Sequence, residues 1–416
     1  MSNRSAVIIG YDSVSPLGTD LEMQWKRAVK GESGIGHLTR FPLPENFPVH
    51  IAGEVDPIDH LSYPFLSMRE QAKWTSPIFR YALLTVQRAL EKSGIDITPD
   101  ISSRVAVTYS SAIGGLDAVL KADRRLISKN AMPHPFTNPN ACINMVGGNI
   151  SILIGSTGPI TSTITACATG LTSIIMGSML LEAGKADIAI CGAADFALVE
   201  PIVAGFAAMN GAFVHKDNEE EEDPSKASRP FSLNRRGFVI SEGAGCIVIA
   251  TKEFARSNGI SFDVEIAGYG MTSDAHHFVA PNLDTIKMCM LKAIQDAKIT
   301  PEMIDTVNAH ATSTRTGDKV EFNALKDVFG DRIPPVTANK SLIGHAMGAS
   351  SAIETVFTVK GMIENRVLPT INYCYDPSID MDCVPDDARS LLQEYVLKNA
   401  FGFGGCNSCV VFHRTG

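Results

Sequence analysis

Thr163-Ile164-Thr165-Ala166-Cys167-Ala168-Thr169-Gly170 is the stretch at which an extended run gives way to a helical one. Residues 160–165 form a short β-branched run, which predicts a strand. After Cys167, apolar side chains recur at helical spacing with small residues between them, which predicts a slim, buried helix. A cysteine at a helix start meets unpaired backbone N–H groups and the positive end of the helix dipole. Both favour the thiolate, so Cys167 is a candidate nucleophile, although a free cysteine is more often a buried structural residue.

Composition limits the classes of protein to consider. The chain has 416 residues, 45% of them hydrophobic, which is enough for a large core and two or three domains. A net charge of −9 without a long basic run argues against nucleic-acid binding, since phosphate contacts need clustered lysine and arginine. We find no apolar run of membrane-spanning length and no signal peptide. Nine cysteines without regular spacing are typical of reduced thiols, so we expect a cytoplasmic protein.

Two short runs resemble functional motifs but have simpler interpretations. Cys406-Asn-Ser-Cys409 has the spacing of a redox or zinc site, yet no second pair or histidine follows it. We interpret it as part of a glycine-rich turn that enters a buried strand. The acidic run from Asn218 to Asp223 predicts a solvated loop, with an acidic docking patch as the alternative.

Strand-like and helix-like runs alternate along the chain, which predicts an α/β fold with a parallel or mixed sheet. Residues 6–11, 104–109, 186–192 and 246–250 are expected strands, 76–93 an amphipathic helix, and 31–66 an irregular excursion.

Near residue 260 the pattern restarts. Val264 to Tyr269 repeats the character of Val7 to Tyr11, each an apolar strand that ends in Gly-Tyr. Three further segments repeat earlier ones in the same order: 305–309 takes the place of 104–108, the helix after Gly344 that of the helix after Cys167, and 399–412 that of 186–192. Chance similarity between short apolar strands is the alternative. We favour two similar α/β halves, residues 1–255 with Cys167 and residues 256–416.

The second half carries two histidines in loops that follow strands, His310 in Asn308-Ala-His-Ala-Thr and His345 in Leu-Ile-Gly-His-Ala. A lone histidine is more often structural than catalytic. Two of them opposite one helix-start cysteine can, however, handle a thioester and an adjacent carboxylate. The glycine-rich segment 401–405 can bring a backbone N–H beside that of Cys167 and complete an oxyanion hole.

The chain resembles the β-ketoacyl-acyl carrier protein synthases, the decarboxylating condensing enzymes of the thiolase superfamily, and most closely their type II elongating members. The matching blocks run in order along nearly the whole chain: Gly158 to Cys167, Arg229-Pro-Phe, Gly237-Phe-Val with Glu242-Gly-Ala-Gly, Ser273-Asp-Ala-His-His277, Asn308-Ala-His310, Lys340-Ser with Gly344-His345, Pro369-Thr-Ile-Asn and Phe401-Gly-Phe-Gly-Gly. The resemblance implies the thiolase fold, in which two similar βαβαβ halves pack as five α-β-α-β-α layers. It also implies a homodimer, or a heterodimer with a related subunit.

The resemblance further implies a mechanism of chain elongation. Cys167 would take an acyl group from acyl carrier protein as a thioester, with the oxyanion on the N–H groups of Cys167 and Phe403. His310 and His345 would stabilise the enolate that forms when malonyl carrier protein loses carbon dioxide. Lys340 would hold a charge near His345 and bond to Glu354. No cofactor is required, because both substrates are carried on phosphopantetheine.

Other roles carry over from the same resemblance. Phe403 matches a gate between the acyl and malonyl compartments, and Ile113 matches the position that limits the acyl pocket. The remaining implied substrate contacts are Phe206, Thr312, Thr314 and Gly402. Asp318 is an implied supporting residue. A structural K⁺ or Na⁺ is implied near Asn308, Glu354 and Asn407.

The sequence also departs from the family pattern. Ala311 replaces a usual glycine, Cys406 precedes Asn407 where threonine is usual, Val279 replaces a threonine, and Asn210 stands where an arginine often serves carrier docking. These changes leave the chemistry in place but open the substrate, so fatty acid elongation has an alternative in a specialised polyketide or aryl-polyene-like pathway.

Other classes of protein fit the sequence less well. A silent chain-length-factor-like partner would lack the cysteine, and a thiolase or starter-unit synthase would need a different third group. A basic rim for an acidic carrier is one interpretation of Arg69, Lys73, Lys121, Arg124 and Arg125. Solvated helix faces are the other.

Overall fold

The apolar runs pair into one nine-stranded mixed sheet in the computed structural model, which describes residues 4–58, 63–215 and 222–416. The strand order is β4-β5-β6-β1-β7-β13-β12-β8-β9. The strands of this sheet are β1 Ala6–Val14, β4 Val105–Ser110, β5 Ile188–Phe196, β6 Glu242–Thr251, β7 Val264–Ser273, β8 Thr306–Asn308, β9 Val336–Thr337, β12 Tyr395–Gly402 and β13 Cys406–Arg414.

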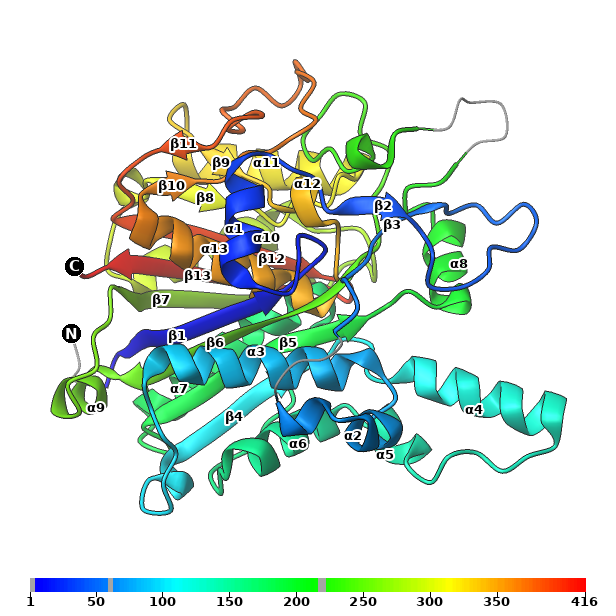
Figure 1. Ribbon diagram of the computed structural model, residues 1–416. Coiled ribbons are helices and arrows are strands. Elements are labelled where there is room, and N and C mark those ends of the chain that lie inside the picture. The colour runs from blue at the N-terminus through cyan, green and yellow to red at the C-terminus, as the bar shows by residue number, and fades with distance from the viewer. Residues whose placement is uncertain (1–3, 59–62, 216–221) are drawn as a thin grey trace.

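The helices fill the connections between these strands (Figure 1). They are α1 Leu21–Val29, α2 Met68–Lys73, α3 Pro77–Ser93, α4 Leu116–Lys129, α5 Thr137–Ala141, α6 Asn144–Ile154, α7 Thr169–Glu182, α8 Glu200–Ala208, α9 Lys252–Ser257, α10 Leu283–Asp296, α11 Arg315–Phe329, α12 Lys340–Ile343 and α13 Gly348–Glu364. Two small hairpins pair β2 Ile35–His37 with β3 Ile51–Gly53, and β10 Arg366–Val367 with β11 Arg389–Ser390. Among the described residues, no helix is both long and apolar enough to cross a bilayer.

The sheet has the internal repeat that the sequence predicts. The order β4-β5-β6-β1 from one side matches β8-β12-β13-β7 from the other, and the two series meet where Val7 and Ile8 pair with Glu265 and Val264. In each series the first pair is parallel and the next two are antiparallel. The prediction of two similar α/β halves is therefore confirmed.

Three hydrophobic clusters separate the layers of the fold. Successive residues of a strand point to opposite faces, so Val7 packs in one cluster and Ile8 in the next. The first cluster joins β4-β5-β6-β1 to α3 and α6, and the third joins β7-β13-β12-β8 to α10 and α11. The second lies between the halves and contains α7 and α13. The two series of strands contribute to opposite sides of the second cluster, so the continuous sheet forms two strand layers. Together with the three helical layers, they give the expected five-layer arrangement.

The central layer explains the small residues after Cys167. A Cβ atom on Gly170 of α7 would lie 2.6 Å from the backbone nitrogen of Ala352 in α13. Only glycine permits this close approach. The two central helices can therefore pack almost backbone to backbone, which brings the ends of both halves to one place.

Several expectations about local structure are wrong in detail. Of the predicted strand 160–165, only Ile160 forms a bridge, to Val107 of β4. This bridge takes the position that the pairing of β9 with β8 takes in the other half. Residues 399–412 are not one strand but most of the hairpin β12–β13, the counterpart of β5 and β6, and Gly404 and Gly405 with φ of 81° and 73° make its turn.

The acidic run is only partly visible. Its residues 218–221 lie outside the described residues. Asp223 is exposed, as a solvated loop would have it, whereas the partly buried Glu222 is ion-paired with Arg229 and Arg236.

Candidate active site

Cys167 lies in a single 3₁₀ turn, Ala166–Ala168, directly before α7. Ala166 has φ of 48°, a left-handed conformation that costs a non-glycine residue free energy and is held only by its surroundings. Two hydrogen bonds hold it: the N–H of Thr165 donates to Thr169 Oγ1, and the Thr169 hydroxyl donates to the carbonyl of Ala166. The sharp turn presents the thiol at the end of the helix, as the sequence predicts.

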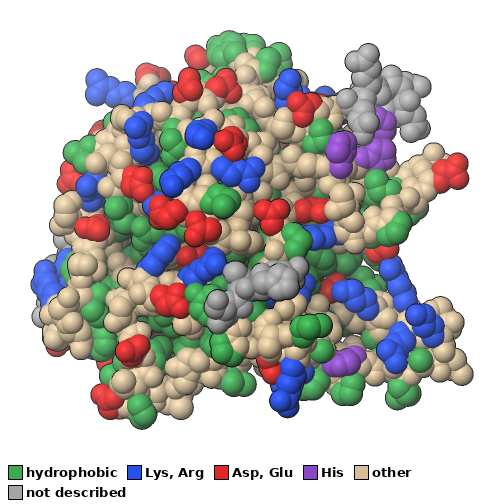
Figure 2. Space-filling view, viewed as in Figure 1, with side chains coloured by type: hydrophobic (Ala, Val, Ile, Leu, Met, Phe, Trp, Pro, Cys, Tyr) green, Lys and Arg blue, Asp and Glu red, His purple; other side chains and the backbone are tan. Residues whose placement is uncertain are grey.

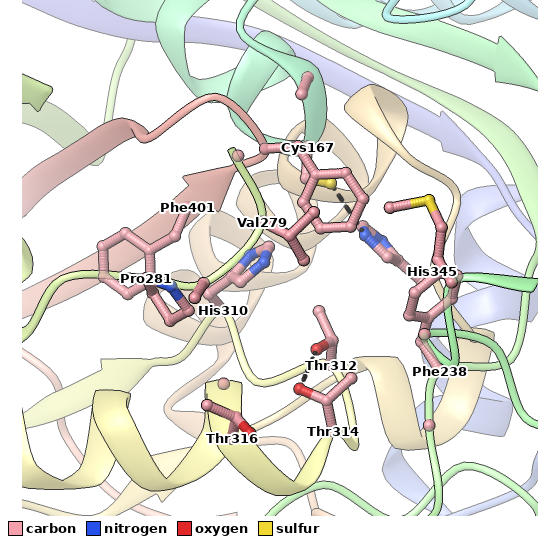
Figure 3. A pocket seen from close by; sticks show the side chains of 18 of the residues that line it. Cys167, Phe238, Val279, Pro281, His310, Thr312, Thr314, Thr316, His345 and Phe401 are labelled. Carbon is pink, nitrogen blue, oxygen red and sulfur yellow. Dashed lines mark hydrogen bonds between the residues drawn. The ribbon is translucent and has the colours of Figure 1, made fainter. Parts of the chain in front are cut away.

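The structure brings both predicted histidines to this thiol (Figure 3). His345 Nε2 lies 3.1 Å from Cys167 Sγ, and the rings of His310 and His345 meet edge to face with 5.8 Å between centroids. Burial lowers the pKa of both imidazoles well below its usual range, and the nearby charge of Lys340 adds to the effect. Both rings are therefore neutral at pH 7.

Burial acts against the effects that were expected to favour the thiolate of Cys167. Burial raises the pKa of its thiol to about 11, and this outweighs Lys340 and the backbone N–H groups of Phe403 and Cys167, which lower it. The two N–H groups nevertheless lie at the sulfur, where an oxyanion hole would need them.

A buried charge network supports the histidines. Lys340 Nζ lies 2.5 Å from Glu354 Oε1 and also donates to the carbonyl of His310, 2.5 Å away. Lys398, which sequence reasoning missed, lies 2.6 Å from Glu354 Oε2. Its signal was a charged residue in the mostly apolar run Val-Leu-Lys-Asn-Ala-Phe of β12. Two buried ammonium groups thus share one carboxylate beside the imidazoles.

Helix α11 holds the loop of His310 from the other side. Glu321, also missed, accepts the N–H groups of His310 and Ala311. Asp318, an expected supporting residue, accepts the N–H groups of Thr314 and Phe231, and burial raises its pKa to about 7. The spacing of the two carboxylates, one helical turn apart on α11, was the available signal.

A second missed carboxylate joins the halves. Asp195, at the end of β5, accepts the N–H groups of Ile113 and Ala349 and the hydroxyl of Ser111. It thereby ties the loop expected to limit the acyl pocket to the start of α13.

One cavity of about 730 Å³ connects these groups. Cys167, His310 and His345 line it together with the expected gate Phe403, with Asn407, and with the five expected substrate contacts Ile113, Phe206, Thr312, Thr314 and Gly402. Lys340, Glu354 and Asp318 are buried behind the wall. The departures Asn210, Val279 and Ala311 all line the same cavity, so they lie where they can alter substrate choice.

The three residues expected near a monovalent cation do not share one cavity in the described structure. Asn407 lines the main cavity, and Asn308 lines a small separate one. Both oxygens of Glu354 are bonded to lysines. The cation stays a prediction.

Cys406 and Cys409 are free thiols three residues apart on β13, hence on opposite faces, and Cys409 is buried. The interpretation of this spacing as a turn entering a buried strand is confirmed. Among described residues no cluster of three or more metal-ligating side chains occurs.

Comparison with known proteins identifies the class that this fold and site define. Models of the beta-ketoacyl synthase N-terminal domain and C-terminal domain match residues 3–255 and 264–374, so the chain belongs to the beta-ketoacyl synthase family of condensing acyltransferases. The 3-oxoacyl-acyl-carrier-protein synthase 2 of Coxiella burnetii is 37% identical, over 100% of this chain and 99% of its own.

Solved structures with a similar fold are also ketosynthases. A type II polyketide synthase acyl-carrier protein in complex with its ketosynthase, bound to the hexaketide, gives a TM-score of 0.89 at 26% identity, over 99% of this chain and 100% of that one. The ishigamide ketosynthase/chain length factor gives 0.89 at 28% identity, over 100% of both chains.

Proposed function

We propose that this chain is an elongating 3-oxoacyl-acyl-carrier-protein synthase of fatty acid synthesis that joins an acyl group on Cys167 to a malonyl group with loss of carbon dioxide. One observation carries the proposal: the Cys167 sulfur lies 3.1 Å from His345 Nε2 in a cavity that His310 also lines. A nucleophile, two neutral imidazoles and two backbone donors are the groups that both half-reactions need.

The first half-reaction is acyl transfer. The Cys167 sulfur attacks the acyl thioester, whose oxygen takes the negative charge and is stabilised by the N–H groups of Cys167 and Phe403. The carbon–sulfur bond to pantetheine then breaks. The proton of the Cys167 thiol ends on the departing pantetheine sulfur, so reactants and products carry the same charge, and negative charge is present only while the oxyanion exists. A thiol with a pKa of about 11 is therefore compatible with the overall step.

The second half-reaction is decarboxylative condensation. The bond between the malonyl α-carbon and its carboxylate breaks, carbon dioxide leaves, and the electron pair stays on the enolate. Neutral imidazoles that donate from His310 and His345 stabilise the enolate oxygen. The α-carbon then attacks the acyl group on Cys167, whose sulfur leaves. Lys340, bonded to the carbonyl of His310, keeps that loop in place.

The rates of acyl transfer and of carbon dioxide release separate the role of Cys167 from that of the histidines. Cys167→Ala should abolish acyl transfer but still release carbon dioxide from malonyl carrier protein, whereas His310→Ala should lose carbon dioxide release and keep acyl transfer. Cys142→Ala, at an exposed cysteine, is the matched control and should leave both rates unchanged. If the wild-type protein neither takes up an acyl group nor releases carbon dioxide, the proposal fails.

Acyl carrier protein is the proposed partner. Figure 2 shows lysine and arginine side chains gathered at the end of the molecule from which α4 projects, and Lys121, Arg124, Arg125 and Lys129 of that helix are exposed. Asp117 and Glu200 pair with Lys121 and Arg124, so part of this charge is neutralised. An acidic carrier fits the remaining positive face.

We also propose a dimer. Exposed apolar side chains occur on α4, on α6 and on the segment that leads to Cys167: Ile127 and Ile152 are 75% and 78% exposed, and Ile160 and Ile164 are 44% and 48% exposed. Residues 161–165 carry no ladder in the described structure, which makes them an edge that a second chain can pair with. A second copy is the proposed occupant, and a related subunit is the alternative.

Nine free cysteines fit the proposed cytoplasmic location.

A specialised polyketide or polyene pathway is the second candidate. Its support is the likeness to the solved type II polyketide ketosynthase and to the ishigamide ketosynthase/chain length factor, together with the presence of Asn210, Val279 and Ala311 in the cavity wall. Competition between saturated and polyunsaturated acyl carriers for Cys167 decides between the two pathways. Preference for the saturated chain supports fatty acid elongation.

A further inference from the structure

His345 is held by a polar contact at each ring nitrogen. Nε2 faces Cys167, and Nδ1 lies 2.9 Å from the hydroxyl oxygen of Ser350 in the first turn of α13. Ser350 is fully buried. Phe238 and His310 each meet the ring edge to face, with 5.4 and 5.8 Å between centroids. These aromatic contacts set the plane of the ring, but they do not decide which nitrogen carries the proton.

The Ser350 hydroxyl can decide which ring nitrogen of His345 carries the proton. A neutral imidazole carries one proton, so one nitrogen donates and the other accepts. Among the described residues, the Ser350 hydroxyl has one hydrogen-bond partner, His345 Nδ1. If Nδ1 carried the proton, the hydroxyl would accept a hydrogen bond from Nδ1. Its own hydrogen would then be buried without an acceptor, which costs free energy. If Nδ1 is bare, the hydroxyl donates to it and both groups are satisfied.

We infer that Ser350 is a positioning residue that fixes His345 with its proton on Nε2. This inference rests on the proposed function, because it makes His345 a hydrogen-bond donor toward the cavity. In the free protein that N–H points at Cys167 Sγ. With malonyl carrier protein bound, it can meet the thioester oxygen on which charge develops as carbon dioxide leaves.

The neighbouring serine provides a matched control. Ser351 is equally buried in the same helix, but its hydroxyl donates to the carbonyl of Gly348 and accepts from the N–H of Leu171. It has no contact with His345 among the described hydrogen bonds. Loss of Ser351 therefore removes a buried hydroxyl without touching the imidazole.

The experiment compares wild type, Ser350→Ala, Ser350→Thr and Ser351→Ala in full-length protein labelled with ¹⁵N-histidine. The ring nitrogen signals of His345 report its tautomer, and malonyl-carrier decarboxylation reports its action. Wild type should show the proton on Nε2. Ser350→Ala should shift the Nδ1 signal toward that of a free acceptor and slow decarboxylation about tenfold. Ser350→Thr, which keeps the hydroxyl, should retain the wild-type signals and rate, as should Ser351→Ala.

A proton on Nδ1 in wild type overturns the inference, even if no Ser350 variant folds. So does a Ser350→Ala variant with unchanged His345 signals and unchanged decarboxylation. A wild-type protein that releases no carbon dioxide contradicts the proposed function instead, and the nitrogen signals still decide the role of Ser350.

Discussion

Replacing Glu354 by glutamine removes the one carboxylate that two buried lysines share. Lys340 and Lys398 approach its two oxygens at 2.5 and 2.6 Å, and all three side chains are at most 2% exposed. The Glu354→Gln variant leaves two buried ammonium groups without their shared carboxylate behind the two histidines, and of the two lysines Lys398 also feels the charge of Glu321.

The structure sets the size of the effect. Removing one partner of a buried ion pair costs about 3–5 kcal/mol, because an uncompensated charge remains. Two pairs are lost here, but one lysine can release its proton, and burial already lowers the pKa of Lys398. We therefore expect a loss of about 3–5 kcal/mol rather than twice that, a large part of a typical stability of about 5–15 kcal/mol.

Urea unfolding of Glu354→Gln and Lys398→Met tests this reasoning. Lys398→Met leaves the neutral pair of Lys340 and Glu354, so its loss should be clearly smaller. Since the native Glu354→Gln protein gives up a lysine proton that the unfolded chain keeps up to about pH 10.5, its stability should rise from pH 7 to pH 10. If Lys398→Met costs as much as Glu354→Gln, or if the stability of Glu354→Gln does not change with pH, the charge-balance argument is refuted.

Three further predictions follow from the cavity. With a thiol pKa of about 11, alkylation of Cys167 by iodoacetamide should speed up about tenfold per pH unit from pH 7 to 9, and a plateau near pH 7 would contradict this. Gly402→Ala would place a Cβ atom 2.2 Å from the carbonyl oxygen of Thr165 and displace the neighbouring Phe403 N–H, so acyl transfer followed by intact mass should slow about 10²–10³-fold. Normal transfer in this variant would argue against that donor. Ile113→Phe should reduce kcat/KM for long acyl carriers more than for short ones, and an equal loss across a chain-length series would remove Ile113 from the pocket end.

The sequence predicted the reactive groups better than their state. Cys167, His310 and His345 could be found because each lies in a local run whose strand-to-helix or strand-to-loop pattern is visible in the sequence. The direction in which the thiol pKa shifts could not be predicted, because it depends on burial by segments that are distant in the sequence. The backbone N–H groups of Phe403 and Cys167 lower the pKa of the thiol, but desolvation outweighs them.

Partners that meet only in the folded chain were missed for the same reason. Lys398 and Glu354 are 44 residues apart, and Asp195 and Ala349 are 154 apart. Ser350 lies only five residues from His345, yet nothing in a run of small residues indicates that its hydroxyl faces the ring. The predicted strand 160–165 failed because the protein offers that edge no further ladder partner among the described residues.

Intact-mass spectrometry after incubation with acyl carrier protein tests most directly whether Cys167 is the group that accepts the acyl chain. We predict that the wild-type protein gains the mass of one acyl group, that the modified peptide contains Cys167, and that Cys167→Ala gains none. An unmodified wild-type protein, or an acyl group on the exposed Cys142 or Cys374 instead, would contradict the account.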